Sequence, residues 1–190
     1  MEKKETSIFI DGRTVLVVDD DEKMLMSLKR ILTDEPYNTI FAKSGQEALE
    51  IINNQDVHLL ITDMCMPGMS GLELLKIVKQ RKPHIIRVAF SGYAEIEVML
   101  AAINNGEIYR FISKPWTSNE ELKTIVLQSL EYYELIGERE LLLEFFETWI
   151  NDIKADSSDI RFLRELVTTR RQHLYDWSKK RKEMTAKVNP

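Results

Sequence analysis

Five polar side chains that could carry out phosphoryl chemistry each follow a short apolar run of the sequence. Asp19 and Asp20 follow VLVV, Asp63 follows LLIT, Ser91 follows VAF, and Lys114 follows FIS. Carboxylates gathered at one place repel each other unless a hard divalent cation lies among them. Mg²⁺ is the natural candidate, because it takes few protein carboxylates and bridges to phosphate oxygens.

A carboxylate that attacks phosphorus needs its own charge and the charge of the incoming group neutralised. A metal ion and the ammonium of Lys114 would supply that neutralisation, and Ser91 offers a hydroxyl to the same group. Each signal has a simpler interpretation by itself, since acidic runs favour helix N-termini and Asp and Ser are common in turns. The placement of all five at successive strand ends favours a phosphoryl-transfer site.

Alternating apolar patterns predict the elements that position these residues. Strands are expected at 13–18, 37–42, 57–62, 85–89 and 108–112, and helices at 21–33, 44–54, 71–81, 94–105 and from about 118 onward. Helix-start signals support these ranges: Ser44 is a cap candidate, and Ser118 with Glu121 forms a capping-box pattern. Asp21 is interpreted as a helix-start residue.

Strands that are separated by helices cannot pair as hairpins, so the sheet is expected to be parallel. The predicted fold is α/β, a doubly wound five-stranded parallel sheet with helices on both faces. In such folds the ligand site lies outside the carboxyl ends of the strands. This is the edge at which the five polar residues would meet.

Four segments resemble the receiver domains of two-component response regulators. They are VLVVDDD at 15–21, LLITDMCMPGMSGLELL at 59–75, AFSGY at 89–93 and YRFISKPW at 109–116, and the resemblance covers about 13–135. It implies a flavodoxin-like receiver fold. The segment GEIYRFISKPW is similar to receivers of hydrogenase-type regulators and of regulators linked to HD-GYP phosphodiesterases.

The resemblance implies a phosphorylation site and a metal site. Asp63 would accept a phosphoryl group from a sensor histidine kinase or a phosphotransfer protein. Mg²⁺ would be held by Asp19, Asp20, Asp63 and the backbone carbonyl of Cys65. The chain would then be a signalling receiver that catalyses only its own phosphoryl transfer and dephosphorylation, and no other enzyme activity is expected.

The resemblance also implies a switch. Ser91 and Lys114 would contact the phosphoryl group, and the ring of Phe111 would swing inward when the loop carrying Ser91 moves. Tyr93, together with the cysteine two residues after the acceptor, would tune the phosphoaspartate lifetime, for which we predict slow self-dephosphorylation. The peptide bond before Pro115 is expected to be cis.

Charge divides the chain into two chemically different parts. Residues 1–153 carry 16 basic and 26 acidic side chains, whereas residues 154–190 carry 10 and 5. We expect an N-terminal arm at 1–12, a receiver domain at 13–135, and an all-α extension at 136–190 with a long helix, a break near 154–159 and a second helix at about 159–182.

Two apolar stripes favour a homodimer through this extension, with a hairpin folded back on the chain as the alternative. The stripes are Leu135, Leu142, Phe146, Trp149 and Ile153, and then Ile160, Leu163, Val167, Leu174 and Trp177.

Other classes of function are disfavoured. No apolar run reaches the roughly 20 residues of a membrane span, and the N-terminus lacks the pattern of a secretory signal. Cys65 is the only cysteine, so no intrachain disulfide is possible, and a cytoplasmic location is expected. The acidic body argues against nucleic-acid binding, although a basic tail that binds nucleic acid remains an alternative. A further alternative is that the chain is the receiver part of a larger enzyme, such as a cyclic-di-nucleotide phosphodiesterase.

Overall fold

The computed structural model describes residues 10–92, 102–103 and 107–152. Several expectations lie outside these residues: the N-terminal arm up to residue 9, most of the helix at 94–105, Tyr93, the break near 154–159 and the second helix of the extension.

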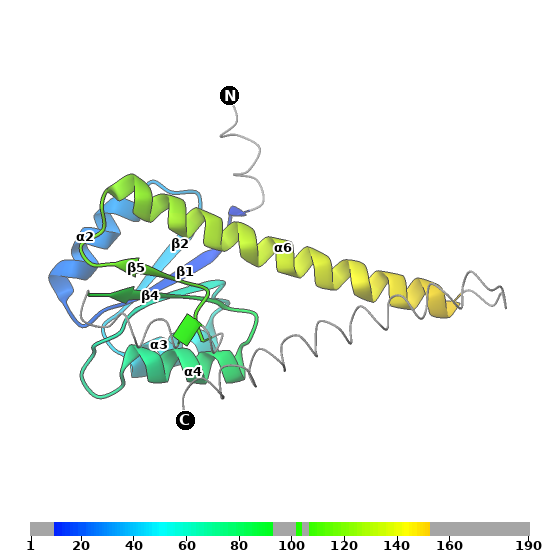
Figure 1. Ribbon diagram of the computed structural model, residues 1–190, viewed down its shortest axis with the longest axis horizontal. Coiled ribbons are helices and arrows are strands. Elements are labelled where there is room, and N and C mark those ends of the chain that lie inside the picture. Colours follow the sequence, from blue (N-terminus) through cyan, green and yellow to red (C-terminus); the bar gives the residue numbers. More distant parts are fainter. Residues whose placement is uncertain (1–9, 93–101, 104–106, 153–190) are drawn as a thin grey trace. The chain divides into compact units, whose positions relative to one another are not determined.

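The core of the fold is one parallel sheet with the strand order β2-β1-β3-β4-β5 (Figure 1). Its strands are β1 (Thr14–Val18), β2 (Asn38–Ala42), β3 (Leu59–Asp63), β4 (Ile86–Ser91) and β5 (Arg110–Ser113). The order reverses between β1 and β3, which is the switch point at which doubly wound folds place their ligands. The predicted fold class is confirmed.

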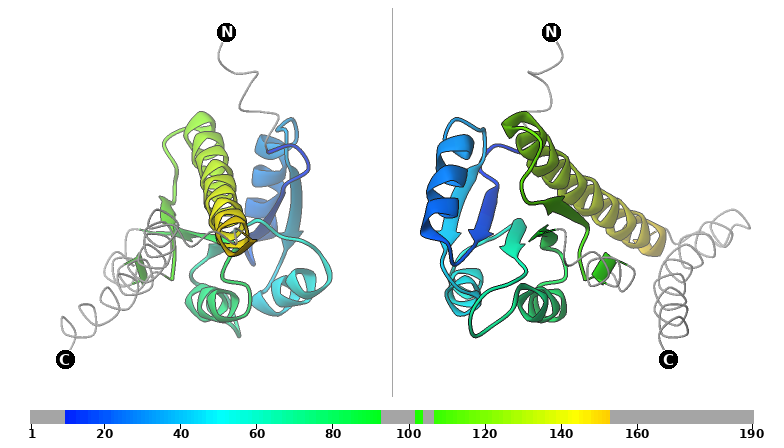
Figure 2. Two further views of the ribbon diagram at one scale, coloured as in Figure 1. Left: turned by 90° about the vertical axis from the view of Figure 1, so that its right-hand side faces the viewer. Right: turned by 60° about the vertical axis from the view of Figure 1, so that its left-hand side comes forward.

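Four described helices connect or follow the strands: α2 (Glu22–Leu32), α3 (Gly45–Asn54), α4 (Gly71–Arg81) and α6 (Asn119–Asp152). Figure 2 shows α2 and the first half of α6 on one face of the sheet, and α3 and α4 on the other. The side chains of Asp21 and Ser44 accept hydrogen bonds from the first turns of α2 and α3. These helix-start predictions are confirmed.

Both faces of the central strands are buried, as a sheet covered by two helical layers requires. Leu16 and Val18 of β1 belong to the cluster formed with α3 and α4, while Val15 and Val17 are equally buried outside that cluster. Side chains alternate between the two faces of a strand. The run VLVV therefore supplies apolar residues to both layers.

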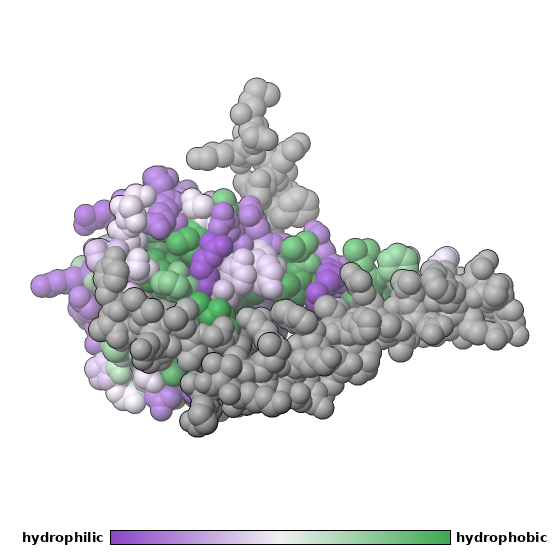
Figure 3. Space-filling view, viewed as in Figure 1, coloured by the Kyte–Doolittle hydropathy of each residue, from purple (hydrophilic) through white to green (hydrophobic). Residues whose placement is uncertain are grey.

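The chain divides into two compact units, Met1–Glu134 and Leu135–Pro190, and α6 continues through the boundary. In the second unit, large apolar side chains of α6 are between 44% and 67% exposed. They are Leu135, Leu141, Leu142, Phe145, Phe146 and Trp149 (Figure 3). Among the described residues, no helix is long and apolar enough to cross a membrane.

Candidate phosphoacceptor site

Three charged side chains converge at the carboxyl edge of the sheet. Asp19 directly follows β1, Asp63 ends β3, and Lys114 directly follows β5. The Lys114 ammonium donates to Asp19 Oδ2 at 2.7 Å and also contacts Asp63 Oδ1. Since β1 and β3 are adjacent and parallel, their ends bring the two carboxylates to one cation.

Burial strengthens the electrostatic attraction between Lys114 and the two carboxylates. Asp19 is 2% exposed and Asp63 is 9% exposed. Burial alone would lower the pKa of Lys114, but hydrogen bonds and charge attraction from Asp19 and Asp63 more than offset it, so the pKa is raised from its ordinary value. Lys114 is therefore a cation at neutral pH and neutralises part of the negative charge of the site.

The main chain orients both carboxylates. Asp19 Oδ1 accepts the backbone N–H of Asp21 at 2.9 Å, and Asp63 Oδ2 accepts the backbone N–H of Cys65 at 2.7 Å. Each carboxylate thus has one oxygen on a backbone amide and the other on Lys114. These two hydrogen bonds fix the orientation of each carboxylate group.

Gly71 allows α4 to begin directly against the end of β3, where Asp63 lies. A Cβ at this position would overlap the carbonyl oxygen of Asp63 and lie 2.9 Å from its carbonyl carbon. The Gly71 N–H donates to the carbonyl of Met64 at 3.1 Å, which closes the loop between β3 and α4. The glycine eight residues after Asp63 is therefore a packing requirement of the site.

Ser91 and Lys114 lie at neighbouring strand ends. The Lys114 N–H donates to the carbonyl of Ser91 at 2.8 Å, and the peptide bond between Lys114 and Pro115 is cis. The side chain of Ser91 is buried, and its hydroxyl donates to the Gly92 carbonyl at 3.1 Å. The backbone thus places Ser91 beside the residue that holds both carboxylates.

The remaining predicted site residues occupy less enclosed positions. Asp20 is exposed next to Asp19, and Cys65 is exposed and forms no disulfide. Phe111 on β5 is 42% exposed, so its ring is at the surface. Tyr93 lies outside the described residues.

The carboxylate oxygens of Asp19, Asp20 and Asp63 are of the chemical type that binds a small, hard cation. Asp19 and Asp63 present carboxylate oxygens to a common point that already attracts a positive charge, and the exposed carboxylate of Asp20 adjoins them. Oxygen donors of this kind suit Mg²⁺. Within the described ranges, however, no three His, Cys, Asp or Glu side chains are yet gathered closely enough to hold a metal ion.

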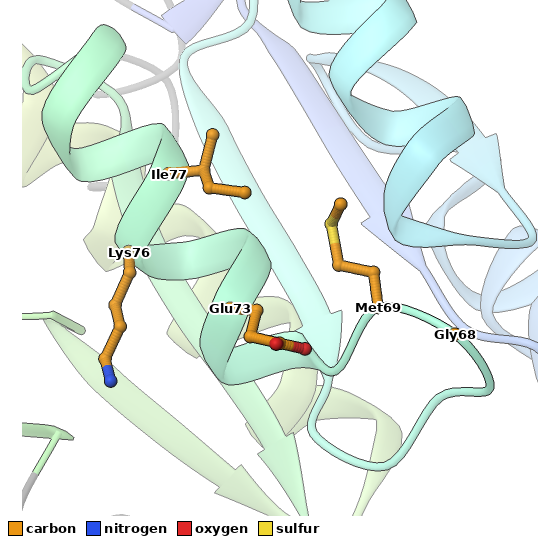
Figure 4. Close-up of a pocket in the computed structure, with 5 residues that line it drawn as sticks. All are labelled: Gly68, Met69, Glu73, Lys76 and Ile77. Carbon is orange, nitrogen blue, oxygen red and sulfur yellow. The ribbon is translucent and has the colours of Figure 1, made fainter.

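A separate pocket of about 380 Å³ lies beside the loop that follows Asp63. Met69 of this loop and Ile77 of α4 line this pocket together with Gly68, Glu73 and Lys76 (Figure 4). The carboxylate of Glu73 accepts from the N–H and hydroxyl of Ser70. This capping box starts α4, and the spacing of Ser70 and Glu73 could have predicted it.

A polar cluster at the opposite edge of the sheet could not be predicted from the sequence. Arg13 contacts both His58 and Glu134 there, although His58 offers no metal-ligand spacing to other histidines. No motif links residues so far apart in sequence. Only the packing of α6 on the sheet brings them together.

The fold and this site define a class of protein. The family model described as the response regulator receiver domain matches residues 15–127, and the chain belongs to that family. It is thus a receiver domain of the two-component type, which implies phosphorylation-dependent signalling.

Its relatives include regulators of hydrogenase genes. The chain is 38% identical over 125 residues to the hydrogenase transcriptional regulatory protein HoxA of Cupriavidus necator, covering 66% of this chain and 26% of the relative. It is 31% identical over 169 residues to HoxA of Bradyrhizobium diazoefficiens, covering 87% and 32%. The chain therefore spans between a quarter and a third of the length of these relatives.

A solved receiver of another regulator type is also similar. The signal receiver domain of an HD domain-containing protein from Pseudomonas fluorescens Pf-5 matches with a TM-score of 0.63 and 34% identity, covering 67% of this chain and 93% of that one. The predicted resemblance to receivers of hydrogenase-type and HD-linked regulators is confirmed.

Proposed function

We propose that Asp63 accepts a phosphoryl group from a sensor histidine kinase or a phosphotransfer protein. The observation that carries this proposal is the contact of one Lys114 ammonium with the carboxylates of both Asp19 and Asp63 at the switch point of the sheet. An Asp63 oxygen forms a bond to phosphorus as the P–N bond of phosphohistidine breaks, and the released imidazole takes up a proton. Apart from this transfer and the hydrolysis of the aspartyl phosphate to inorganic phosphate, we propose no enzymatic activity.

The chain's own residues prepare the acceptor for attack. The Cys65 N–H holds one oxygen of Asp63, and Lys114 lowers the repulsion between the carboxylate and an incoming phosphoryl group. In the proposal, Asp19, Asp20, Asp63 and the Cys65 carbonyl hold Mg²⁺. The ion supplies charge neutralisation to the phosphoryl oxygens when it is bound.

Phosphorylation then moves the switch residues. The phosphoaspartate carries a charge of roughly −2, which attracts Lys114 and the Ser91 hydroxyl. The exposed ring of Phe111 turns inward as the Ser91 loop moves. In this proposal Cys65 and Tyr93 shield the phosphoaspartate from water and prolong its lifetime.

Two contacts join β5 to the first half of α6 and offer a route for the signal. The rings of Tyr109, which directly precedes β5, and Tyr132 stack with centroids 4.3 Å apart, and Arg110 donates to the side-chain amide oxygen Oε1 of Gln128 at 2.7 Å. Phe111 follows Tyr109 and Arg110 directly in the sequence. A displaced Phe111 would therefore act on a strand that α6 already contacts.

The proposed output is a change in assembly through the helical extension. Leu135, Leu142 and Trp149 are spaced by seven residues, with Phe145 and Phe146 between the last two, and all five are exposed. This spacing is that of a helix packed against another helix. A second copy of the chain is the proposed partner, in the cytoplasm, where the thiol of the single cysteine remains reduced.

Transcriptional control is a second candidate for the output. Both HoxA relatives are named transcriptional regulatory proteins, and their similarity to this chain extends in one case over 87% of it. The basic tail alone is a weaker basis for nucleic-acid binding, because such runs are usually solvated helix faces. Salt-dependent binding to DNA by the chain would support this candidate.

The phosphorylation proposal is tested by intact-mass measurement after incubation with acetyl phosphate and Mg²⁺. One phosphoryl group is expected on the wild type and none on Asp63→Asn. Asp34→Asn, which replaces an exposed aspartate away from the site, is the matched control and is expected to be phosphorylated normally. Phosphorylation of Asp63→Asn to the wild-type level would reject Asp63 as the acceptor.

A further inference from the structure

An ion pair fixes α6 to the sheet at the edge opposite Asp63. Arg13 Nε lies 2.5 Å from Glu134 Oε1, and a terminal nitrogen of Arg13 donates to Glu134 Oε2 at 3.0 Å. Arg13 immediately precedes β1, and Glu134 is the last residue of the first compact unit. Only the contact with Glu134 Oε2 has hydrogen-bond geometry, whereas Arg13 Nε and Glu134 Oε1 are buried and interact as charges without a hydrogen bond.

His58 lies against this pair and has hydrogen-bond donors on both sides. Its Nδ1 accepts the backbone N–H of Thr14 at 3.0 Å, and its Nε2 lies 3.3 Å from the terminal nitrogen of Arg13 that does not donate to Glu134. A neutral ring with its lone pair on Nδ1 carries hydrogen on Nε2, so the Nε2 contact with Arg13 is not a hydrogen bond. Protonation of Nδ1 would remove the acceptor of the Thr14 N–H and place a second positive charge beside Arg13.

The ring of Tyr133 completes the contact with α6. It meets His58 edge to face with centroids 5.0 Å apart, and the guanidinium carbon of Arg13 lies 5.6 Å from the Tyr133 centroid. Tyr133 and Glu134, adjacent on α6, are thus held by side chains that precede β1 and β3. A protonated and displaced His58 would disturb both contacts.

The groups around His58 have opposing effects on its pKa. Burial and the nearby cation of Arg13 lower the pKa of His58, with His84 acting in the same direction, while Asp56 and Glu134 act to raise it. The net direction is downward. Neutral His58 is thus the resting form at neutral pH.

We propose that Arg13, His58 and Glu134 form an acid-sensitive latch. This latch holds the part of α6 near residue 134 against the sheet, and it opens when His58 takes up a proton. The latch lies at the sheet edge opposite the phosphoacceptor and needs no phosphoryl group. It is therefore a second input that goes beyond the proposed phosphorylation function. Acidification would loosen α6 near residue 134 whether or not Asp63 is phosphorylated.

The sign of the pH dependence follows from proton linkage. A histidine whose pKa is lower in the folded chain than in the unfolded one stabilises the fold above its ordinary value of about 6.5. This stability is lost as the pH falls through the lower, folded-state pKa. Each unit by which that pKa is depressed corresponds to about a tenfold change in the equilibrium between closed and open latch.

Hydrogen–deuterium exchange of the α6 peptide covering residues 128–134 tests the latch between about pH 5 and pH 8. After correction for intrinsic exchange rates, protection in the wild type is expected to fall towards the acidic end. His58→Gln keeps an acceptor but cannot titrate, so its protection should not vary with pH. His84→Gln removes only the smallest of the influences on the pKa of His58, so the acid response should persist and shift slightly to higher pH.

Ion-pair variants separate the latch from a general loss of folding. Glu134→Gln should lower protection of this peptide at neutral pH, and the charge swap Arg13→Glu with Glu134→Arg should restore part of it. Phosphorylation by acetyl phosphate reports whether each variant is folded, because Asp63 lies at the other edge. An unchanged acid response in His58→Gln, or unchanged protection in Glu134→Gln, would overturn the latch while leaving the phosphoacceptor proposal intact.

Discussion

The Lys114 ammonium and the Asp19 carboxylate are joined by a 2.7 Å hydrogen bond although 95 residues separate them in the sequence. The same ammonium contacts Asp63, so a single cation neutralises part of the charge of two buried carboxylates. Stability and the proposed phosphoryl transfer therefore depend on the same atoms.

Replacing Lys114 by methionine should destabilise the metal-free protein. The change leaves the carboxylates of Asp19 and Asp63 without their shared donor, at an expected cost of about 2 kcal/mol in the free energy of unfolding. Urea denaturation in the presence of a chelator measures this cost. Lys76→Met, at an exposed lysine of α4, is the control and should change stability little. Equal stability of the two variants would show that the ammonium contributes no net stabilisation.

Mg²⁺ should bind more weakly when Asp20 is replaced by asparagine. Asp20 is exposed, so the substitution removes a proposed metal ligand without removing a partner of Lys114. The fluorescence of Trp116, whose ring lies 5.9 Å from that of Phe90 beside the site, can report the titration. Asp21→Asn is the matched control, because asparagine also caps helices well. Similar Mg²⁺ affinity in both variants would exclude Asp20 as a ligand.

Gly71→Ala should strain the loop that follows Asp63. The new Cβ overlaps a backbone carbonyl that cannot rotate away, and we expect a loss of about 2 kcal/mol in stability together with slower phosphorylation. Gly137→Ala is the contrasting variant, since nothing lies within 4 Å of a Cβ there. It should stabilise α6 by about 0.5–1 kcal/mol. Chemical denaturation of both variants measures the difference, and a neutral Gly71→Ala would contradict the packing argument.

The double substitution of Leu142 and Phe145 by glutamine should prevent self-association of the phosphorylated chain. Both side chains are exposed on the second half of α6, and their loss removes apolar surface that a second copy would cover. Analytical ultracentrifugation with and without a phosphate mimic gives the mass of the assembly. Glu144→Gln, an exposed change between them, should assemble as the wild type does. A wild type that stays monomeric in both states would refute the proposed dimer.

The sequence was sufficient to predict the sheet and the convergence of Asp19, Asp63 and Lys114, because parallel order alone brings the ends of the strands to one edge. Helix-start prediction was less complete. The Ser118 hydroxyl oxygen accepts the Glu121 N–H at 3.1 Å as predicted, but the Glu121 carboxylate accepts from the backbone N–H of Thr117 at 2.9 Å instead of from that of Ser118. Which backbone N–H the Glu121 carboxylate accepts depends on the conformation of its side chain, which the sequence pattern does not specify.

The contacts of His58 could not be predicted, for a different reason. Its partners are Arg13 and Thr14 at the start of β1 and Tyr133 on α6. No local pattern specifies which face of the 34-residue helix α6 meets the sheet at that point. The apolar residues Leu122, Val126 and Leu130, all fully buried, fix this face. The cluster at His58 is a consequence of that packing.

Asp19 and Asp63 each place one oxygen on a backbone amide and the other on Lys114. In the proposed metal site, an arriving divalent ion would therefore replace an ammonium counterion that the carboxylates already hold. The two carboxylates would have a cationic partner both before and after the ion binds. Since the backbone amides would keep their oxygens, this exchange would need no reorientation of either carboxylate.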